Sequence, residues 1–413
     1  MSFSEHRKKL LDAMAPDSLA VCYAGRPLHA NEDDYYEFIV NSQFFWLTGL
    51  EREGMILLLA KTDAGTAETL FIEQADPTAE RWTGKMPVKE DAKAVSGIED
   101  IRYLEGFTAC LDRYMNRSRI RTVYFDVFRN GSEDLPDLNA VKASAFAAKY
   151  PAVRLQDLHE AVLPLRRIKD SMEIGRIREA VDLTRRGLEQ VMSTLRPGMK
   201  EYQVQTIFEA SCRYNGAEKM AFGTIAGSGI NGCMMHYRTN HCTVPDDGLI
   251  LLDLGAKYEN YCSDITRTYP VSGRYSPRQR QYYELVLKAN RAVAAAAKPG
   301  VTLKELNELT KQILAEGLTA MGKISSPDQV GKYYMHSVSH SIGIDVHDIN
   351  LGTDPLQPGW VISDEPGLYI DEEEIGIRIE DDLLITEDGC EVLSQAILRD
   401  PDEIEAFMAA HKA

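Results

Sequence analysis

The sequence predicts two domains, a small α/β domain followed by a larger α+β domain that consists of two related halves. Its 413 residues, 44% hydrophobic and 26% charged, are enough for two domains of ordinary globular composition. Before residue 165, short apolar runs alternate with helical stretches, which is typical of an α/β domain. After residue 165, a succession of two helices, a histidine and two strands occurs twice, which indicates two halves that face each other.

Four apolar runs predict the strands of the first domain. They lie at residues 19–24, 55–60, 69–72 and 122–128. Residues 134–150 have the periodicity of an amphipathic helix.

A strong helix start marks the change to the second domain. Asp170 precedes an apolar periodic stretch, and Glu173 follows three positions later, as in a capping box. We therefore expect a long helix over residues 171–195 and place the domain boundary near residue 165. The domains are then residues 1–165 and 166–413.

The second domain contains a weak internal repeat. Each copy begins with a helix that ends at a Pro-Gly pair, residues 197–198 in the first copy and 299–300 in the second. Strands follow later in each copy, most clearly at residues 249–253 and 360–365. Helices are expected at 171–195, 202–215, 277–297 and 303–321. Chance similarity between two α+β segments is the alternative explanation.

Each half carries one histidine and two acids near strand ends. The set is His236, Asp253 and Asp264 in the first half, and His340, Glu365 and Glu380 in the second. Asp253 ends an apolar run, where a buried carboxylate is costly unless a cation or hydrogen-bond donors compensate it. A hairpin would place Asp253 opposite Asp264. Strand alternation puts Arg378 on the same face as Glu380.

Together these acids predict a metal site. Four carboxylates that converge without a cation would raise one another's pKa values, whereas two divalent cations would balance their charge. Oxygen ligands with one imidazole favour Mn²⁺, Fe²⁺ or Co²⁺, and two such ions would hold a hydroxide and polarise a carbonyl, which predicts a hydrolase. Each of these residues also has a simpler interpretation when it is considered alone. Asp253 would then be a turn residue, Glu380 a solvent-exposed acid at a sheet edge and His340 a histidine of the core.

Charge and cysteine content exclude several other classes of protein. The net charge of −17 argues against binding to nucleic acid, because it repels a phosphate backbone. No apolar run approaches the length of a membrane span, and the charged N-terminus lacks the apolar core of a signal peptide. Seven scattered cysteines without a metal-type spacing are typical of reduced thiols in a cytoplasmic protein.

Several motifs, in order along the chain, resemble a known family. They are Asp253-Leu254-Gly255, Ser263–Thr268, His336–Asp348, Glu365-Pro366-Gly367-Leu368-Tyr369 and Gly376–Asp382. Together they resemble the pita-bread metallopeptidases, in particular the proline-specific branch of aminopeptidase P and Xaa-Pro dipeptidase. Residues 41–49 and 81–84 resemble the N-terminal domain of the same enzymes. The resemblance implies an α/β N-terminal domain and an α+β pita-bread (creatinase/aminopeptidase-like) catalytic domain with pseudo-twofold halves.

The resemblance also implies a set of metal ligands. The matching residues are Asp253, Asp264, His340, Glu365 and Glu380, with Asp264 and Glu380 as the bridging carboxylates. They imply two divalent metal ions. Mn²⁺ is the expected metal, with Co²⁺, Fe²⁺ or Zn²⁺ as alternatives.

Catalytic and substrate-binding roles follow from the same resemblance. Glu365 is expected to pass a proton to the leaving proline nitrogen, and Arg378 to orient a metal ligand. His236 and His347 are expected to contact the substrate and stabilise the tetrahedral intermediate. The substrate pocket is expected to include Tyr369, His336 and Trp82, the last from the first domain or from a neighbouring subunit.

One residue departs from the family pattern. Asp364 stands where an apolar or small residue usually precedes the glutamate of the Glu-Pro-Gly motif. On a strand it should point away from Glu365, so we do not expect it to bind metal. It leaves open which group compensates an acid at this position.

The resemblance implies a soluble exopeptidase that acts on proline-containing peptides, neither on nucleic acid nor at a membrane, as a homodimer or homotetramer. Xaa-Pro aminopeptidase is favoured over Xaa-Pro dipeptidase, because only 16 residues separate Asp348 from Glu365 and leave little room for a segment that caps the substrate carboxylate. A methionine aminopeptidase, a creatinase-like hydrolase and a catalytically silent binding protein on the same fold are the remaining alternatives.

Overall fold

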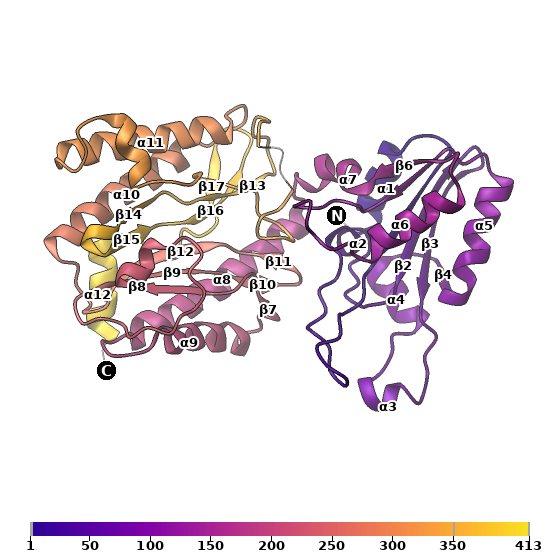
Figure 1. Cartoon of the computed structure of the whole chain (residues 1–413), viewed down its shortest axis with the longest axis horizontal. Coiled ribbons are helices and arrows are strands. Elements are labelled where there is room, and N and C mark those ends of the chain that lie inside the picture. The colour runs from indigo at the N-terminus through magenta and orange to yellow at the C-terminus, as the bar shows by residue number, and fades with distance from the viewer. Residues whose placement is uncertain (1–2, 350–351, 412–413) are drawn as a thin grey trace. The chain divides into compact units, whose positions relative to one another are not determined.

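The structure is a computed structural model that describes residues 3–349 and 352–411. It divides into two compact units, Met1–Arg166 and Arg167–Ala413, which can be followed by colour in Figure 1. Among the described residues, no helix combines the length and the apolar character that a membrane crossing requires.

The first unit is built on a six-stranded mixed sheet with the strand order β4-β3-β2-β1-β5-β6. Its strands are β1 (Ser18–Tyr23), β2 (Ile56–Thr62), β3 (Gly65–Ile72), β4 (Asp100–Tyr103), β5 (Thr122–Phe125) and β6 (Arg154–Asp157). The central strands β1, β2 and β3 pair antiparallel, and the outer pairs are parallel. The predicted α/β class is confirmed, although two strands, β4 and β6, were not predicted.

The helices of the first unit are α1 (Phe3–Ala13), α2 (Ser42–Thr48), α3 (Glu80–Thr83), α4 (Lys89–Ser96), α5 (Phe107–Arg117), α6 (Leu138–Lys149) and α7 (Leu158–Arg166). The predicted helix at 134–150 begins four residues late, because Asp137 caps the amide of Ala140 at 2.8 Å. Side chains of β1, β2, β3 and β5 form the core with those of α5 and α6.

The second unit contains short antiparallel sheets and long helices. Its strands are β7 (Lys219–Met220), β8 (Ile225–Ser228), β9 (Leu249–Leu254), β10 (Ala256–Tyr258), β11 (Tyr261–Cys262), β12 (Ile265–Pro270), β13 (Val361–Asp364), β14 (Gly367–Ile370), β15 (Ile375–Arg378), β16 (Asp381–Ile385) and β17 (Cys390–Val392). Its helices are α8 (Ser171–Thr194), α9 (Glu201–Tyr214), α10 (Pro277–Ala296), α11 (Leu303–Ala320) and α12 (Pro401–His411). The sheets pair as β8–β9–β12, β13–β16–β17, β14–β15 and β7–β10–β11.

The two halves predicted from the internal repeat are present in the second unit. Helices α8 and α9 pack together in the first half, and α10 and α11 pack together in the second. Figure 1 shows the strands between these two helix pairs. The pita-bread architecture inferred from the resemblance is therefore confirmed.

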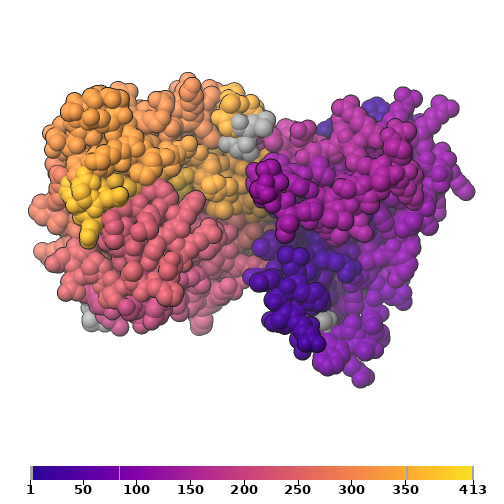
Figure 2. All heavy atoms as spheres, in the orientation of Figure 1, coloured from indigo at the N-terminus to yellow at the C-terminus, as the bar shows by residue number. Residues whose placement is uncertain are grey.

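The C-terminal helix α12 joins the two halves of the second unit. It contacts α8 of the first half and α10 of the second. In Figure 2 its yellow surface lies between the orange and the pink parts of this unit. The end of the described chain therefore contributes to the packing of both halves.

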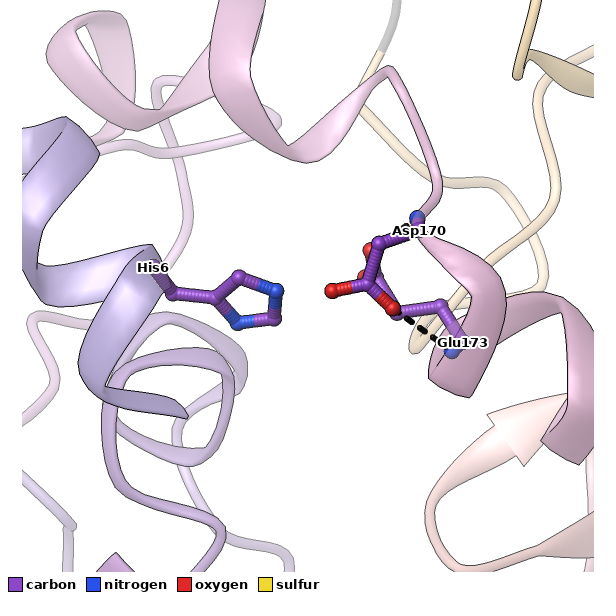
Figure 3. Close-up of side chains that lie close together, drawn as sticks. All are labelled: His6, Asp170 and Glu173. Carbon is purple, nitrogen blue, oxygen red and sulfur yellow. Dashed lines mark hydrogen bonds between the residues drawn. The ribbon is translucent and has the colours of Figure 1, made fainter. Parts of the chain in front are cut away.

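The predicted capping box begins α8. Asp170 Oδ1 accepts hydrogen bonds from the backbone amides of Met172 and Glu173, at 2.8 and 3.1 Å. Glu173 Oε2 in turn accepts from the amide of Asp170 at 2.8 Å, and both side chains are drawn in Figure 3. Reciprocal capping fixes the first turn of this 24-residue helix.

Candidate metal centre

A cavity of about 340 Å³ in the second unit brings the predicted ligands together. Its wall includes Asp253, Asp264, His340, Glu365 and Glu380, together with His236, His336, His347 and Arg378. Four apolar side chains, of Phe222, Ile225, Met235 and Val346, also line the wall. A cavity with an apolar wall and a group of converging acids is the form expected of an active site.

Strand ends of both halves position the four acids. Asp253 lies in β9, and Asp264 directly precedes β12. Glu365 directly follows β13, and Glu380 joins β15 to β16. In the β9–β12 pair, Thr266 and not Asp264 lies opposite Asp253. The hairpin register predicted from the sequence was therefore wrong by two residues, but both acids still reach the cavity.

His340 faces three of these carboxylates. Its Nε2 lies 3.3 Å from Asp264 Oδ2, 3.4 Å from Glu365 Oε1 and 4.0 Å from Glu380 Oε1. Its Nδ1 lies 3.1 Å from the carbonyl oxygen of Ser341. Because a carbonyl only accepts hydrogen bonds, Nδ1 is the donor in this contact, which leaves Nε2 to face the carboxylates. A cation among these atoms would be held by the carboxylates and by Nε2 together.

The acids themselves lack protein partners for some of their oxygens. Asp253 Oδ1 and Asp264 Oδ1 are buried and accept no hydrogen bond from the described residues. Burial, together with nearby acids such as Asp253, raises the pKa of Asp264 well above its usual range. Burial and the carboxylate of Asp264 do the same to the pKa of Glu380. Since buried acceptors are normally satisfied, this donor set fits divalent cations.

Arg378 organises one side of the acid group. Its Nη2 donates to Asp253 Oδ2 at 2.6 Å, and its Nε donates to Thr266 Oγ1 at 3.1 Å. Thr266 Oγ1 donates to Glu380 Oε2 at 2.6 Å. Arg378 therefore contacts Asp253 directly and reaches Glu380, the acid on its own strand face, only through Thr266.

Tyr369 and His336 extend this hydrogen-bond chain. Arg378 Nη1 donates to the hydroxyl of Tyr369, whose oxygen lies 2.8 Å from His336 Nε2. His336 Nδ1 lies 2.8 Å from the carbonyl oxygen of Ser337 and must carry the proton, so Nε2 accepts from Tyr369. Burial and the positive charge of Arg378 lower the pKa of His336 to about 4, which keeps the ring neutral.

Two further histidines lie at the exposed part of the cavity wall. The ring of His347 stacks on that of His340 with a centroid distance of 3.9 Å and an interplanar angle of 16°. Desolvation and the imidazoles of His340 and His236 lower the pKa of His347 to about 4. His236 is exposed and lies three residues after the short 3₁₀ helix η2 (Gly229–Cys233).

Other predicted residues lie elsewhere. Trp82 belongs to the first unit, where it lies in α3 and is 86% exposed. Asp364 does not line the cavity. It is fully buried, lies opposite Asp381 in the β13–β16 pair, and its Oδ2 accepts from Asn290 Nδ2 at 3.2 Å. Burial, with the nearby charge of Asp381, raises the pKa of Asp364 well above its usual range.

Sequence reasoning missed two hydroxyls that orient the predicted ligands. One is Thr266. The other is Ser363, whose Oγ donates to Glu365 Oε1 at 3.2 Å and accepts from the amide of His340 at 2.9 Å. Ser363 stands two positions before Glu365, so strand alternation could have placed both on one face.

Comparison with known proteins gives consistent results for the two units. Residues 175–387 match the family model Metallopeptidase family M24, and residues 3–124 match Aminopeptidase P, N-terminal domain. The chain is 32% identical to the Xaa-Pro aminopeptidase of Escherichia coli K12, over 99% of this chain and 97% of that protein.

Solved structures are similar over the same extent. A Bacillus anthracis protein assigned as an aminopeptidase P has a TM-score of 0.97 and 36% identity, covering 100% of this chain and 98% of that chain. Zinc-substituted aminopeptidase P of Escherichia coli, in complex with product, has a TM-score of 0.89 and 30% identity, again covering 100% and 98%.

Proposed function

The chain belongs to metallopeptidase family M24, and from this premise we propose that it is an Xaa-Pro aminopeptidase, a metallo-exopeptidase that releases the N-terminal residue of peptides with proline in second position. The observation that carries the proposal is the single cavity in which four acids and His340 converge. Whole-chain similarity to Xaa-Pro aminopeptidases favours this activity over that of an Xaa-Pro dipeptidase. We assign residues 1–165 to the N-terminal domain and residues 166–413 to the catalytic domain.

Two divalent cations would be held by Asp253, Asp264, His340, Glu365 and Glu380. The unsatisfied oxygens of Asp253 and Asp264 and the Nε2 atom of His340 support this ligand set. When bound, such ions supply Lewis acidity toward the peptide carbonyl and lower the pKa of water. Mn²⁺ is the expected metal, with Co²⁺, Fe²⁺ or Zn²⁺ as alternatives.

The chain's own residues then have distinct roles. Glu365, which Ser363 orients, would carry a proton to the nitrogen of proline as the peptide bond breaks. His236 and His347 would donate hydrogen bonds to the oxygen that gains negative charge. Their places at the exposed part of the wall leave them accessible to a peptide.

The substrate side of the cavity would be fixed by a chain of three hydrogen-bonded side chains, those of Arg378, Tyr369 and His336. Their hydrogen bonds run in one direction, from the guanidinium through the hydroxyl to the neutral imidazole. We propose that Trp82 contacts the substrate from the first domain or from a neighbouring subunit of a homodimer or homotetramer. We also propose a cytoplasmic location.

The test compares two substrates after chelator treatment and addition of Mn²⁺. Cleavage of Ala-Pro-Ala establishes Xaa-Pro aminopeptidase activity, and cleavage of Gly-Pro alone would establish a dipeptidase instead. Ala-Ala-Ala serves as the control for proline specificity. Absence of Mn²⁺-dependent cleavage of either proline peptide, with the other three metals also tried, would contradict the proposal.

A further inference from the structure

The segment between β8 and β9 forms one wall of the cavity but has little regular structure of its own. Apart from Ser228, which ends β8, residues 228–242 have regular structure only in the short helix η2. His236, Met235 and Arg238 of this segment line the cavity. A histidine that must meet a substrate at a fixed distance therefore depends on contacts from outside the segment.

Glu201, the first residue of α9, supplies most of these contacts. Its side chain is fully buried. Oε1 accepts from the amide and hydroxyl of Ser228, at 2.9 and 2.7 Å, and from Asn231 Nδ2 at 3.0 Å. Oε2 accepts from the hydroxyl of Tyr237 at 2.8 Å and from the amide of Cys242 at 2.9 Å. One carboxylate thus binds the beginning, the middle and the end of the segment.

The negative charge of Glu201 is essential to this arrangement. All five partners donate, so both oxygens must act as acceptors, which only an ionised carboxylate allows. Although burial opposes ionisation, these hydrogen bonds hold the pKa of Glu201 below its usual value. An amide at this position would present two N–H groups to Tyr237 and Cys242 or to Ser228 and Asn231.

The contacts of Glu201 flank His236 on the chain. Tyr237, held through its hydroxyl, is the residue next to His236. On the other side, the backbone of Gly232 packs on that of Gly376, where a Cβ atom would lie 2.0 Å from the carbonyl oxygen of Gly232. The backbone that carries His236 is therefore fixed between Glu201 and the strand that carries Arg378.

We propose that Glu201 is a positioning residue that holds residues 228–242 so that His236 meets the substrate. This proposal rests on the proposed function, in which His236 stabilises the developing negative charge. Glu201 lies outside the ligand set and acts only through the segment that it binds.

The test uses Glu201→Gln in the full-length, Mn²⁺-loaded protein, alone and combined with His236→Ala. We expect Glu201→Gln to retain both metal ions and to lower kcat for Ala-Pro-Ala by about ten- to a hundredfold, the loss typical of removing a hydrogen bond to a charged group. In the His236→Ala background the same change should lower kcat by less than about twofold. Equal losses in both backgrounds would overturn the proposal. The control is Glu189→Gln, because Glu189 lies in α8 and pairs with Arg185 of the same helix, outside the segment.

A second readout does not need activity. Amide hydrogen exchange of residues 228–242 should accelerate in Glu201→Gln, whereas residues 341–348, the segment of His347, should keep their protection. Unchanged exchange, or acceleration throughout the unit, would overturn the positioning role. If the wild-type protein cleaves no Xaa-Pro peptide while exchange accelerates as expected, the proposed function fails and the positioning role stands. Should Glu201→Gln not fold, Tyr237→Phe removes one of the five bonds and must show the same dependence on His236.

Discussion

The second unit contains two groups of buried acids that are neighbours in sequence but differ in how their charge is balanced. The cavity cluster consists of Asp253, Asp264, Glu365 and Glu380. The rear cluster consists of Asp364 and Asp381 with Asn290, Arg267 and Arg399. Asp364 adjoins Glu365 in the chain, and Asp381 adjoins Glu380.

In the rear cluster the charge of Asp381 is balanced by the protein itself, although Asp364 Oδ1 and Asn290 Oδ1 accept no hydrogen bond from the described residues. Asp381 Oδ1 accepts from Arg267 Nη2 at 2.7 Å and from Ser394 Oγ at 2.6 Å, and Oδ2 accepts from Arg399. Although burial opposes ionisation, the two guanidinium groups hold the pKa of Asp381 at about 2. Burial and the neighbouring charge of Asp381 raise the pKa of Asp364 well above its usual range, which favours its protonated form. The sequence left open which group would compensate Asp364, and in the structure Asn290 donates a hydrogen bond to its Oδ2.

The cavity cluster has four carboxylates but direct contact with a single guanidinium, that of Arg378 on Asp253. It also contains buried oxygens without hydrogen-bond partners among the described residues. The charge of acids in one unit can thus be balanced by protein cations, as at Asp381, or left for metal cations, as in the cavity cluster. The unpartnered oxygens of Asp253 and Asp264 belong to residues that line the cavity, whereas Asp364 does not line it.

The largest effect should come from removing a carboxylate of the cavity cluster. We expect Asp264→Asn and Glu380→Gln each to lower kcat by at least about a thousandfold, equivalent to about 4 kcal/mol. Bound metal should fall below two ions per chain, because each carboxylate would contribute to both sites. Steady-state kinetics and elemental analysis of the purified variants check this. Normal turnover with either variant would contradict a dimetal centre.

Breaking the rear cluster should affect stability before activity. Arg267 is fully buried, so Arg267→Met leaves the buried charge of Asp381 with only one of its two guanidinium partners and should lower the free energy of unfolding by about 3–5 kcal/mol. Urea denaturation measures this loss. The control is Arg178→Met, which removes the exposed ion pair with Glu391 and should cost less than about 1 kcal/mol. Equal losses of unfolding free energy in Arg267→Met and Arg178→Met would contradict the prediction that the buried ion pair stabilises the protein more than the exposed one.

Asp264 of the cavity cluster and Asp381 of the rear cluster should respond oppositely to pH in the metal-free protein. Asp264 has a raised pKa, so the folded state binds its proton more tightly than the unfolded state, and stability should rise as the pH falls. Asp381 has a lowered pKa, so its contribution is present above the unfolded value and is lost as the pH falls toward 2.

Chelated wild-type protein and Asp264→Asn should be compared by thermal unfolding from pH 9 to pH 5. Their difference in stability reports Asp264 together with its effect on Glu380, because the lowered pKa values of His336 and His347 act in the opposite direction in both proteins. The advantage of the variant should shrink toward pH 5. An advantage that is independent of pH would contradict the raised pKa.

The smallest effect should follow from Asp364→Asn. Because the raised pKa of Asp364 favours its neutral form and Asn290 donates to its Oδ2, an amide of similar shape should change the free energy of unfolding by less than about 1 kcal/mol. Metal content should stay at two ions and kcat should stay within about twofold. Loss of metal in this variant would show that the two clusters are coupled.

The sequence predicted those parts of the fold that depend on local pattern. Strands β1, β2 and β5 are apolar runs, and α8 starts at a capping box, so each was predicted from its own residues. Strand β6 reads Arg-Leu-Gln-Asp, with one apolar residue at the edge of the sheet, and gave no such signal. Its pairing with β5 creates the strand, and that pairing is a long-range contact.

The same limit applies to the site. The metal ligands were grouped by resemblance, and the structure brings them to one cavity. Arg378 was predicted to orient a ligand, and it contacts Asp253. Thr266 and Glu201 were not found, because Thr266 reaches Glu380 over 114 positions in the chain and Glu201 reaches Tyr237 over 36. The sequence around Asp364 also did not indicate Asn290 or Arg399 as members of the rear cluster, because both residues lie in other parts of the chain.

The contacts of Arg267 have a consequence for synthesis of the protein. Besides Asp381, this buried guanidinium donates to the carbonyl oxygens of Ile397 and Leu398, and Arg399 completes the partners of Asp381. Helix α12, which joins both halves, follows directly. Since folding during translation proceeds from the N-terminus, the second unit cannot reach its final charge balance until the ribosome has released these last residues. A nonsense codon just before Ile397 would therefore leave a chain with every proposed metal ligand but with a buried arginine short of acceptors, and we expect cellular proteases to remove it.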